Sequence, residues 1–312
     1  MKAFRKSREN DLLKLRRDMK RDWQLYLFLL PAVLIIFFFN YVPIYGLQIA
    51  FQDFKPTRGI WGSAWVGLKW FQRFLKSPNM LVYVRNTLSL SVLGVLIAFP
   101  LKILLALILN EIRMPKYKKF VQTVTYAPYF ISITVLVSMM NLMLQKETGV
   151  LTQLFETIGV PAGNWLTSPT AFPWLFVTSG MWQQTGWGAV IFLAALAGVD
   201  PQLHEAAMID GASRLQRIWH VNLPSILPTI TIMLILQMGG LMSVSHDKAL
   251  LMQNALNLES SELISTYVYK IGLQKAQYSL SAAVGMINSV VNVILMLSMN
   301  WIVKKMGQVT AI

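Results

Sequence analysis

Long apolar runs separated by short polar segments make up most of the chain. A helix needs about 20 apolar residues to cross the hydrocarbon core of a bilayer. Six runs reach this length, at residues 25–51, 86–109, 121–144, 173–198, 226–245 and 281–303. We therefore predict an all-α membrane protein with six transmembrane helices.

The composition supports a surface that faces lipid. Hydrophobic residues make up 55% of the 312 positions and charged residues only 13%, whereas a soluble domain has roughly 25% charged residues. The chain has no cysteine, which excludes disulfides and cysteine-based metal or redox chemistry. Its three histidines, His204, His220 and His246, are scattered along the sequence. We expect neither a metal site nor a cofactor bound by this chain.

The distribution of basic residues predicts the orientation of the helices, because cytoplasmic segments of membrane proteins are enriched in Lys and Arg. Nine of the 28 basic residues precede the first apolar run: Lys2, Arg5, Lys6, Arg8, Lys14, Arg16, Arg17, Lys20 and Arg21. This places the N-terminus in the cytoplasm, and six crossings place the C-terminus there too. The connection E-I-R-M-P-K-Y-K-K after the second run agrees, whereas the basic external connection 52–85 goes against the rule.

The predicted organisation has four parts. They are a cytoplasmic basic amphipathic segment at 1–24, the first helix with its external connection at 25–85, a membrane core at 86–303, and a cytoplasmic tail at 304–312. The basic segment suits contact with anionic membrane lipid, with contact to a partner protein as the alternative. No aromatic-rich or folded reader accompanies it, so we expect no nucleic-acid partner. Trp61, Trp65 and Trp70 cluster in the external connection and predict an interfacial element or a small folded cap.

The polar segment 200–224, between the fourth and fifth apolar runs, predicts a pair of short helices. Asp200 is a suitable N-cap with Pro201 at the first helical position. Gly211 suits the left-handed position that ends a helix. Ser213 and Gln216 then have the spacing of a capping box, which starts a second helix.

Pro224 and Pro228 are expected to interrupt this second helix where the fifth apolar run begins. A plain linker between two membrane helices is the alternative interpretation of the segment. A linker needs neither two capped helices nor adjacent alanines, which allow another backbone to approach closely. We therefore interpret the segment as a docking element on the cytoplasmic face.

The same segment resembles the EAA loop of permease subunits in bacterial binding-protein-dependent ABC importers. The family pattern is E-A-A, three residues, G, nine residues, then I-x-L-P. The matching residues are Glu205, Ala206, Ala207, Gly211 and Val221-Asn222-Leu223-Pro224, with Val replacing Ile as the one departure. The segments L-F-L-L-P-A-V, F-x-N-Y-x-P-x-Y and R-N-T-L resemble the carbohydrate and oligosaccharide branch, so the resemblance covers nearly the whole chain.

The resemblance implies a type I ABC importer permease in the bacterial cytoplasmic membrane, with several partners. These would be a second homologous permease subunit, two cytoplasmic ATPase subunits that use ATP and Mg, and an extracytoplasmic solute-binding protein. ATP-driven closure of the ATPase subunits would switch the paired permeases between inward-facing and outward-facing states. The ATPase-coupling residues implied are Glu205, Ala206, Ala207, Asp210, Gly211, Leu223 and Pro224. Glu205 would make a polar contact, the alanines would lie against a groove of the ATPase, and Gly211 would allow the turn.

Polar groups within the apolar runs are candidates for a substrate path, because such groups are costly in lipid. Trp182, Gln183, Gln184 and Trp187 combine aromatic faces with amides, which match the C–H faces and hydroxyls of a sugar. An interfacial aromatic belt with helix-joining amides is an equal alternative. Asn288 and Asn292 have helical spacing and fit the same cavity, although hydrogen bonding between helices suits them better. Lys102 is interpreted as snorkelling toward the cytoplasm or pairing with a neighbouring helix.

These features favour a transport subunit for a sugar or oligosaccharide. The alternative cargo is a peptide, a polyamine or a phosphate compound, and the sparse charge within the apolar runs argues mildly against a strongly charged one. The chain has no G-x-x-x-x-G-K-S/T phosphate loop, so it is not expected to hydrolyse ATP itself. An intramembrane enzyme is disfavoured because the apolar runs hold no acidic residue. A receptor or a stand-alone channel would have no use for the EAA segment.

Overall fold

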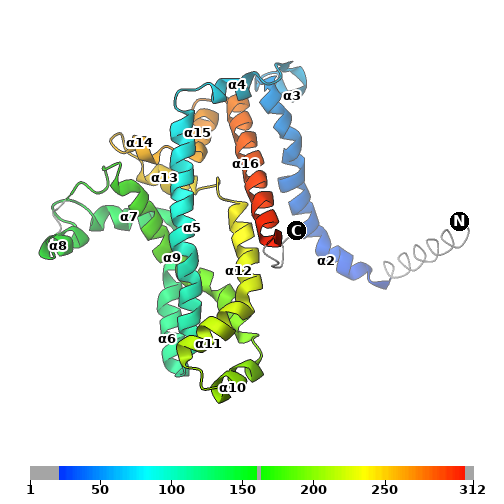
Figure 1. The fold of residues 1–312 in the computed structure, drawn as a ribbon. Coiled ribbons are helices and arrows are strands. Elements are labelled where there is room, and N and C mark those ends of the chain that lie inside the picture. The colour runs from blue at the N-terminus through cyan, green and yellow to red at the C-terminus, as the bar shows by residue number, and fades with distance from the viewer. Residues whose placement is uncertain (1–20, 160–162, 306–312) are drawn as a thin grey trace, which may run out of the picture. The chain divides into compact units, whose positions relative to one another are not determined.

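The computed structural model describes residues 21–159 and 163–305 and forms two compact units, Met1–Gly67 and Leu68–Ile312. Helices account for nearly all of the secondary structure in the described residues (Figure 1). Most of the predicted basic segment 1–24 and of the tail 304–312 lies outside the described residues.

The first unit consists of one long apolar helical run and a small cap. The run begins as α2 (Trp23–Ile36), widens into the π-helix η1 (Phe37–Tyr41) and tightens into the 3₁₀-helix η2 (Val42–Phe51). Its apolar stretch is wholly exposed, as expected of a surface that lies in lipid. The prediction of an apolar helix over 25–51 is confirmed, with α2 beginning at Trp23.

The cap follows directly and accounts for part of the tryptophan cluster. Strands β1 (Gln52–Asp53) and β2 (Ala64–Trp65) pair antiparallel on either side of the short helix α3 (Gly59–Gly62). The Trp65 ring stacks on Phe51 with 5.7 Å between ring centroids, and Trp61 lies 5.7 Å from Tyr45. Trp70 instead belongs to α4 (Lys69–Leu75) of the second unit.

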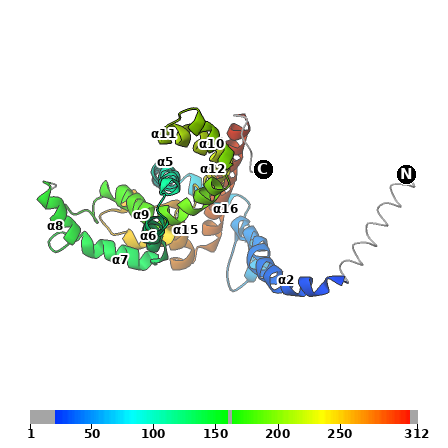
Figure 2. The ribbon, with the colours of Figure 1, turned by 90° about the horizontal axis from the view of Figure 1, so that it is seen from below.

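The second unit is organised around α5 (Met80–Glu111) and α9 (Ala171–Ala197), which make the most extensive contact between any two described elements. Figure 2 looks along α5 and shows α9 beside it, with α8 on one side of this pair and α16 on the other. The remaining helices are α6 (Pro115–Tyr126), η3 (Ala127–Phe130), α7 (Ile133–Met143), α8 (Val150–Thr157), α10 (Pro201–Ile209), α11 (Arg214–Arg217), η4 (Ile218–Asn222), α12 (Leu223–Met238), α13 (His246–Met252), α14 (Leu258–Ser261), α15 (Ile264–Tyr269), η5 (Lys270–Gln274) and α16 (Tyr278–Lys305).

The prediction of a continuous helix over 121–144 is wrong, because the chain bends by 98° between η3 and α7. Pro128 has no N–H to donate to the helix ladder, and Ile131 adopts an extended conformation. Ser132 then caps α7 by accepting a hydrogen bond from the Val135 amide. At the bend, the Gln183 side chain on α9 donates a 2.7 Å hydrogen bond to the Ile131 carbonyl.

Other helix ends also differ from those predicted. The helix of the fifth apolar run ends at Met238 instead of residue 245, because Gly239 and Gly240 follow Met238 in a turn.

Four described helices are long and apolar enough to cross a membrane, and the number reaches six if each of two bent pairs counts as one crossing. The fold class, a helical membrane protein with several crossings, is confirmed.

Three buried hydrophobic clusters hold the second unit together. One joins α4, α5, α15 and α16 through Phe74, Tyr83, Ile264 and Leu280. A second joins the middle of α5 to α7, α9 and α13, and the third joins the last turns of α5 and α9 to the start of α12. The clusters lie on successive stretches of α5, so this helix sets the positions of the elements around it.

Candidate functional site

The segment after α9 forms a sharply delimited helix. Asp200 caps α10 by accepting a 2.9 Å hydrogen bond from the Gln202 amide, and Pro201 occupies the first helical position. Proline is well tolerated there because the amide it lacks would have no partner inside the helix. The predicted cap is therefore confirmed.

Gly211 ends α10 in the predicted left-handed conformation, with φ +76°. The Ala212 amide donates to the Ala207 carbonyl at 2.9 Å, and the Gly211 amide donates to the Met208 carbonyl at 3.1 Å. These two hydrogen bonds make a Schellman motif, which satisfies carbonyls at the end of a helix. A side chain at position 211 would strain the backbone whatever space surrounds it.

Ser213 and Gln216 form the predicted capping box of α11. The Ser213 amide donates to the Gln216 side chain at 2.7 Å, and the Gln216 amide donates in return to the Ser213 hydroxyl at 3.4 Å. The predicted interruption at Pro224 and Pro228 is wrong, because Arg214–Met238 runs as one continuous helix. The π-helical turn η4 ends two residues before Pro224 and lets the helix continue despite the amide hydrogen that proline lacks.

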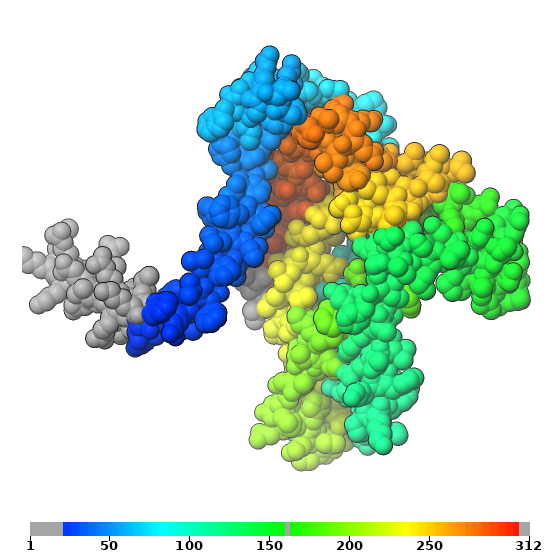
Figure 3. Space-filling model, turned by 180° about the vertical axis from the view of Figure 1, so that it is seen from behind, coloured from blue at the N-terminus to red at the C-terminus, as the bar shows by residue number. Residues whose placement is uncertain are grey.

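The surface of this segment is uncovered. Ile209 is 86% exposed, Leu215 69% and Trp219 64%, so apolar side chains accompany the exposed polar residues of this segment. Figure 3 shows the segment, in yellow-green, at the lower end of that unit. Among the predicted coupling residues, the exposed ones are Glu205, Ala206, Asp210, Gly211 and Pro224, whereas Ala207 and Leu223 are half-buried. Leu223 packs against the buried cluster at the ends of α5 and α9.

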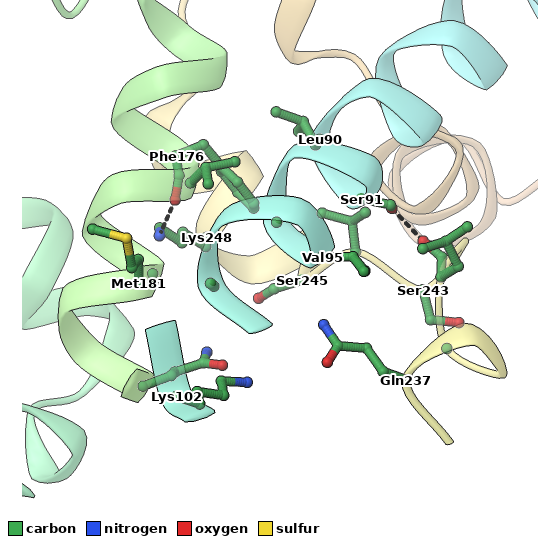
Figure 4. Close-up of a pocket in the computed structure, with 18 residues that line it drawn as sticks. Leu90, Ser91, Val95, Lys102, Phe176, Met181, Gln237, Ser243, Ser245 and Lys248 are labelled. Atoms are coloured by element: carbon green, nitrogen blue, oxygen red, sulfur yellow. Dashed lines mark hydrogen bonds between the residues drawn. The ribbon is translucent and has the colours of Figure 1, made fainter. Parts of the chain in front are cut away.

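A polar cavity of about 340 Å³ lies between α5, α9 and the segment that joins α12 to α13 (Figure 4). Ligand sites commonly span roughly 300–1,000 Å³, so this cavity is large enough to hold part of an organic cargo. The polar side chains that line it are Ser91, Lys102, Gln184, Gln237, Ser243, Ser245 and Lys248. Its walls therefore offer two cations, two amides and three hydroxyls.

Lys248 reaches the cavity from α13, although it is only 4% exposed. Its Nζ donates a 2.7 Å hydrogen bond to the Phe176 carbonyl and lies 4.6 Å from the centre of the Phe176 ring. Burial lowers the pKa of this amine to about 8, because removal from water disfavours the charged form. A Cβ atom at Gly180 would lie 3.1 Å from the same Nζ, so that glycine leaves room for the ammonium group.

Lys102 reaches the same cavity from α5, and its side chain is directed across it toward Gln237 (Figure 4). A Cβ atom at Gly188 would lie 2.7 Å from Lys102 Cδ. The lysine side chain therefore passes α9 at a position where that helix carries only a glycine. In the described part of the chain, no carboxylate lies within ion-pairing distance of Lys102 or Lys248. Lys102 thus lies against the neighbouring helix α9 without an ion pair among the described residues, and snorkelling toward the cytoplasm stays a prediction.

Sequence reasoning missed Lys248 and the two glycines. Lys248 lies beyond the predicted membrane helices, and only the fold brings it beside α9. A signal for the glycines was present, because Gly180, Gln184 and Gly188 recur every four residues and therefore share one face of a helix. Within the described residues, no group of three His, Cys, Asp or Glu side chains could hold a metal ion.

The predicted substrate-path residues of α9 point in different directions. Gln184 lines the polar cavity. Gln183 is 6% exposed and supports the bend between η3 and α7, whereas the Trp187 ring stacks on Tyr129 with 4.9 Å between centroids. Trp182 is 49% exposed and lines two other cavities with mainly apolar walls. Of the four, Gln184 alone lines the cavity that holds the lysines.

The asparagines of α16 lie outside the lining of this cavity. Asn292 accepts a 2.8 Å hydrogen bond from the Met242 amide and donates a 2.9 Å hydrogen bond to the Ser243 hydroxyl. It thereby positions the segment that forms one wall of the cavity. The buried Asn288 Oδ1 has no hydrogen-bond partner among the described residues.

Comparisons with known proteins give a consistent result across the chain. Residues 102–308 match the family described as binding-protein-dependent transport system inner membrane component. Protein LplB of Bacillus subtilis is 41% identical over 93% of this chain and 91% of its own length. The polygalacturonan/rhamnogalacturonan transport system permease protein YteP of the same organism is 42% identical over 91% of this chain and 88% of its own.

A solved structure is similar over nearly the full length. It is a bacterial alginate ABC transporter in complex with a periplasmic protein that carries an alginate pentasaccharide. The similar chain covers 96% of this one and is itself covered completely, with 34% sequence identity and a TM-score of 0.86. The similarity therefore extends to the order and placement of the helices.

Proposed function

The chain belongs to the inner membrane components of binding-protein-dependent transport systems, and we propose that it forms one half of the translocation path of an ATP-driven importer. It is a multi-pass membrane permease subunit of a sugar or oligosaccharide importer, and members of this family are transport subunits and not enzymes. The second half of the path would come from a homologous permease subunit. Two cytoplasmic ATPase subunits would bind ATP and Mg and hydrolyse the ATP.

The cargo class is supported by the relatives and by the cavity. YteP is described as a polygalacturonan/rhamnogalacturonan permease, and the structural relative takes part in alginate transport. Hydroxyl and amide groups line the cavity beside Phe176, which suits a sugar with its many hydroxyls and apolar C–H faces. These observations favour a sugar or oligosaccharide over a peptide, polyamine or phosphate compound. An external binding protein would deliver it.

One observation carries the coupling part of the proposal: the segment from Asp200 to Pro224 is rigidly capped yet uncovered. Hydrogen bonds at Asp200, Gly211 and Ser213 fix its shape, while Ile209, Leu215 and Trp219 remain exposed. Such a preformed apolar surface with a polar rim is typical of a protein-binding site. The ATPase subunit would cover it, with Glu205 at the rim.

Replacing Gly211 by Val tests this proposal. The positive φ at this position disfavours a β-branched residue, so the loop should lose its shape, and both ATPase co-purification and ATP-driven oligosaccharide uptake should fall about tenfold or more. Gly159→Val is a matched control, because Gly159 also has a positive φ and no atom near its Cβ position but lies at the end of α8.

A second pair of variants tests the polar contact. Glu205→Gln removes the charge of an exposed side chain in the segment, and Glu147→Gln does the same in the turn before α8. Only the first should weaken co-purification of the ATPase. An intact complex with normal uptake in both Gly211→Val and Glu205→Gln would show that the segment does not couple the permease to an ATPase.

A further inference from the structure

Two lysines from distant parts of the chain share the polar cavity shown in Figure 4. We propose that Lys102 and Lys248 recognise carboxylates on the cargo, so that the importer carries acidic oligosaccharides built from sugar acids. This inference rests on the proposed function, because it assumes that the cavity belongs to a sugar path. It concerns the charge of the sugar and the residues that detect it.

The charge of the cavity is the first support. Among the described residues, its lining includes both lysines and no aspartate or glutamate, and neither lysine has an ion-pair partner. Two cations that are partly removed from water attract an anion more strongly than they would in bulk water. The apolar runs contain few charges, which argued mildly against a charged cargo. Two lysines nevertheless line the same cavity, so that argument does not apply there.

The shape of α9 is the second support. Gly180, Gln184 and Gly188 form one stripe on this helix, and the two glycines lie where the lysine side chains pass. A Cβ atom would press on the Lys248 ammonium at one position and on the Lys102 stem at the other. Gln184 lies between them and faces the same cavity. The helix thus admits both cations and offers an amide to hydrogen-bond a sugar.

The incomplete pairing of Lys248 is the third support. An ammonium group has three N–H donors, and the Phe176 carbonyl accepts one of them. The described residues provide no other acceptor for this nearly buried group. A buried charge without a counter-charge is costly, and such a group in a membrane protein marks a functional site. A carboxylate in the cavity would supply both the missing acceptor and the missing charge.

The proposal assigns different roles to the two lysines. Lys102 is half-buried and projects across the cavity, so it can follow a moving carboxylate. Lys248 is held against Phe176 at one wall and provides a fixed positive charge. The aromatic ring and the amides of Gln184 and Gln237 would contact the body of the sugar. With about 340 Å³, the cavity would hold only part of an oligosaccharide at a time.

The test uses the complete importer, with both permease subunits, the ATPase subunits and the binding protein, in proteoliposomes. The cargo is a panel of short oligosaccharides that includes a galacturonate trisaccharide, each offered as the free acid and as its uncharged methyl ester, together with neutral oligosaccharides. The variants are Lys102→Met and Lys248→Met. Lys102→Arg keeps the charge, and Lys146→Met is a control at an exposed lysine between α7 and α8.

We expect the wild-type importer to take up free acids in preference to their esters. Each Met variant should reduce uptake of the acid by about tenfold or more, the factor that corresponds to roughly 1.4 kcal/mol. Lys102→Arg should retain most of the uptake, and Lys146→Met should retain all of it. The half-buried position of Lys102 keeps the test valid if Lys248→Met fails to assemble.

Three results would overturn the inference and leave the proposed function intact. In the first, the wild-type importer carries neutral oligosaccharides and rejects acidic ones. In the second, the Lys102→Met variant imports acidic oligosaccharides at the wild-type rate. Alternatively, the Met variants would lose the second permease subunit during purification, which would show that the lysines pair with a carboxylate of that subunit. Failure of the wild-type importer to carry any oligosaccharide would instead contradict the proposed function itself.

Discussion

At the scale of single residues, Lys248 has the most informative environment in the second unit. Its amine is buried, it donates to a backbone carbonyl and it lies over an aromatic ring. The sequence shows only a lysine between a polar segment and the short apolar run 249–252, so neither the burial nor the shared cavity could be predicted. These properties depend on α5, α9 and α13, which are separated along the chain and meet only in the folded protein.

The pKa of Lys248 predicts how stability depends on pH. Burial lowers this pKa from 10.5 to about 8. Below pH 8 the amine is charged in both the folded and the unfolded chain, so the folded state bears the full cost of burial. Between pH 8 and 10.5 the folded chain releases its proton while the unfolded chain keeps it, so stability rises with pH, by up to about 3 kcal/mol.

Thermal unfolding of the purified complex at several pH values measures this effect. The Tm of wild type relative to Lys248→Met should increase between pH 8 and 10.5 and stay constant below pH 8. Lys102 is the other ionisable group in the cavity. Helices α7 and α9 carry none, whereas α15, which also packs against α13, carries Tyr267 and Tyr269. The same comparison in a Lys102→Met background removes the other amine, and the tyrosines are present in both proteins compared. A Tm difference that falls over this pH range would contradict the assigned environment.

At the level of elements, capping signals predicted the ends of α10 and the start of α11, whereas bends were predicted poorly. Asp200, Gly211 and the Ser213–Gln216 pair act within one or two turns of the backbone, so sequence spacing alone revealed them. The 98° bend after η3 depends also on the Gln183 side chain, which is 52 positions away from Ile131. Continuity of the helix through Pro224 was missed because a π-helical turn leaves no mark in hydrophobic periodicity.

The contact between α6 and α9 is close enough to require a glycine. A Cβ atom at Gly186 would lie 1.9 Å from the Thr125 carbonyl oxygen, so Gly186→Ala must push the two backbones apart. We expect a loss of stability of about 1–3 kcal/mol, seen as a lower Tm of the purified complex. Gly285→Ala is the matched control, because its Cβ position on α16 has no neighbour within 4 Å. Equal Tm values for the two variants would show that the helices do not approach this closely.

At the level of the whole second unit, the uncovered segment and the polar cavity lie in different places. An uncovered, capped segment occupies one end of the second unit, and a polar cavity lies between α5, α9 and α13. The contact between α5 and α9 joins the two regions, because both helices line the cavity and both reach the cluster that supports Leu223. Any displacement of the segment would therefore act directly on helices that form the cavity.

Much of this organisation was predictable because membrane helices and the EAA segment leave strong signals in one sequence. The class of protein and the capped helices of the 200–224 segment followed from these signals, whereas the coupling role of its residues stays a prediction. The cavity did not, because its lining combines Ser91, Gln184, Gln237 and Lys248 from four separate segments. Trp182 and Trp187 illustrate the limit, since both were predicted to face the cargo although the stripe of Gly180, Gln184 and Gly188 marks a different face of α9.

If this chain forms part of an ATP-driven sugar path, oligosaccharide uptake by reconstituted vesicles must depend on it. Proteoliposomes that contain the complete importer should accumulate a labelled oligosaccharide only when ATP and the binding protein are both present. Vesicles prepared without this chain should accumulate none. Equal accumulation with and without the chain, or accumulation that does not depend on ATP, would show that the chain is not part of an ATP-driven sugar path.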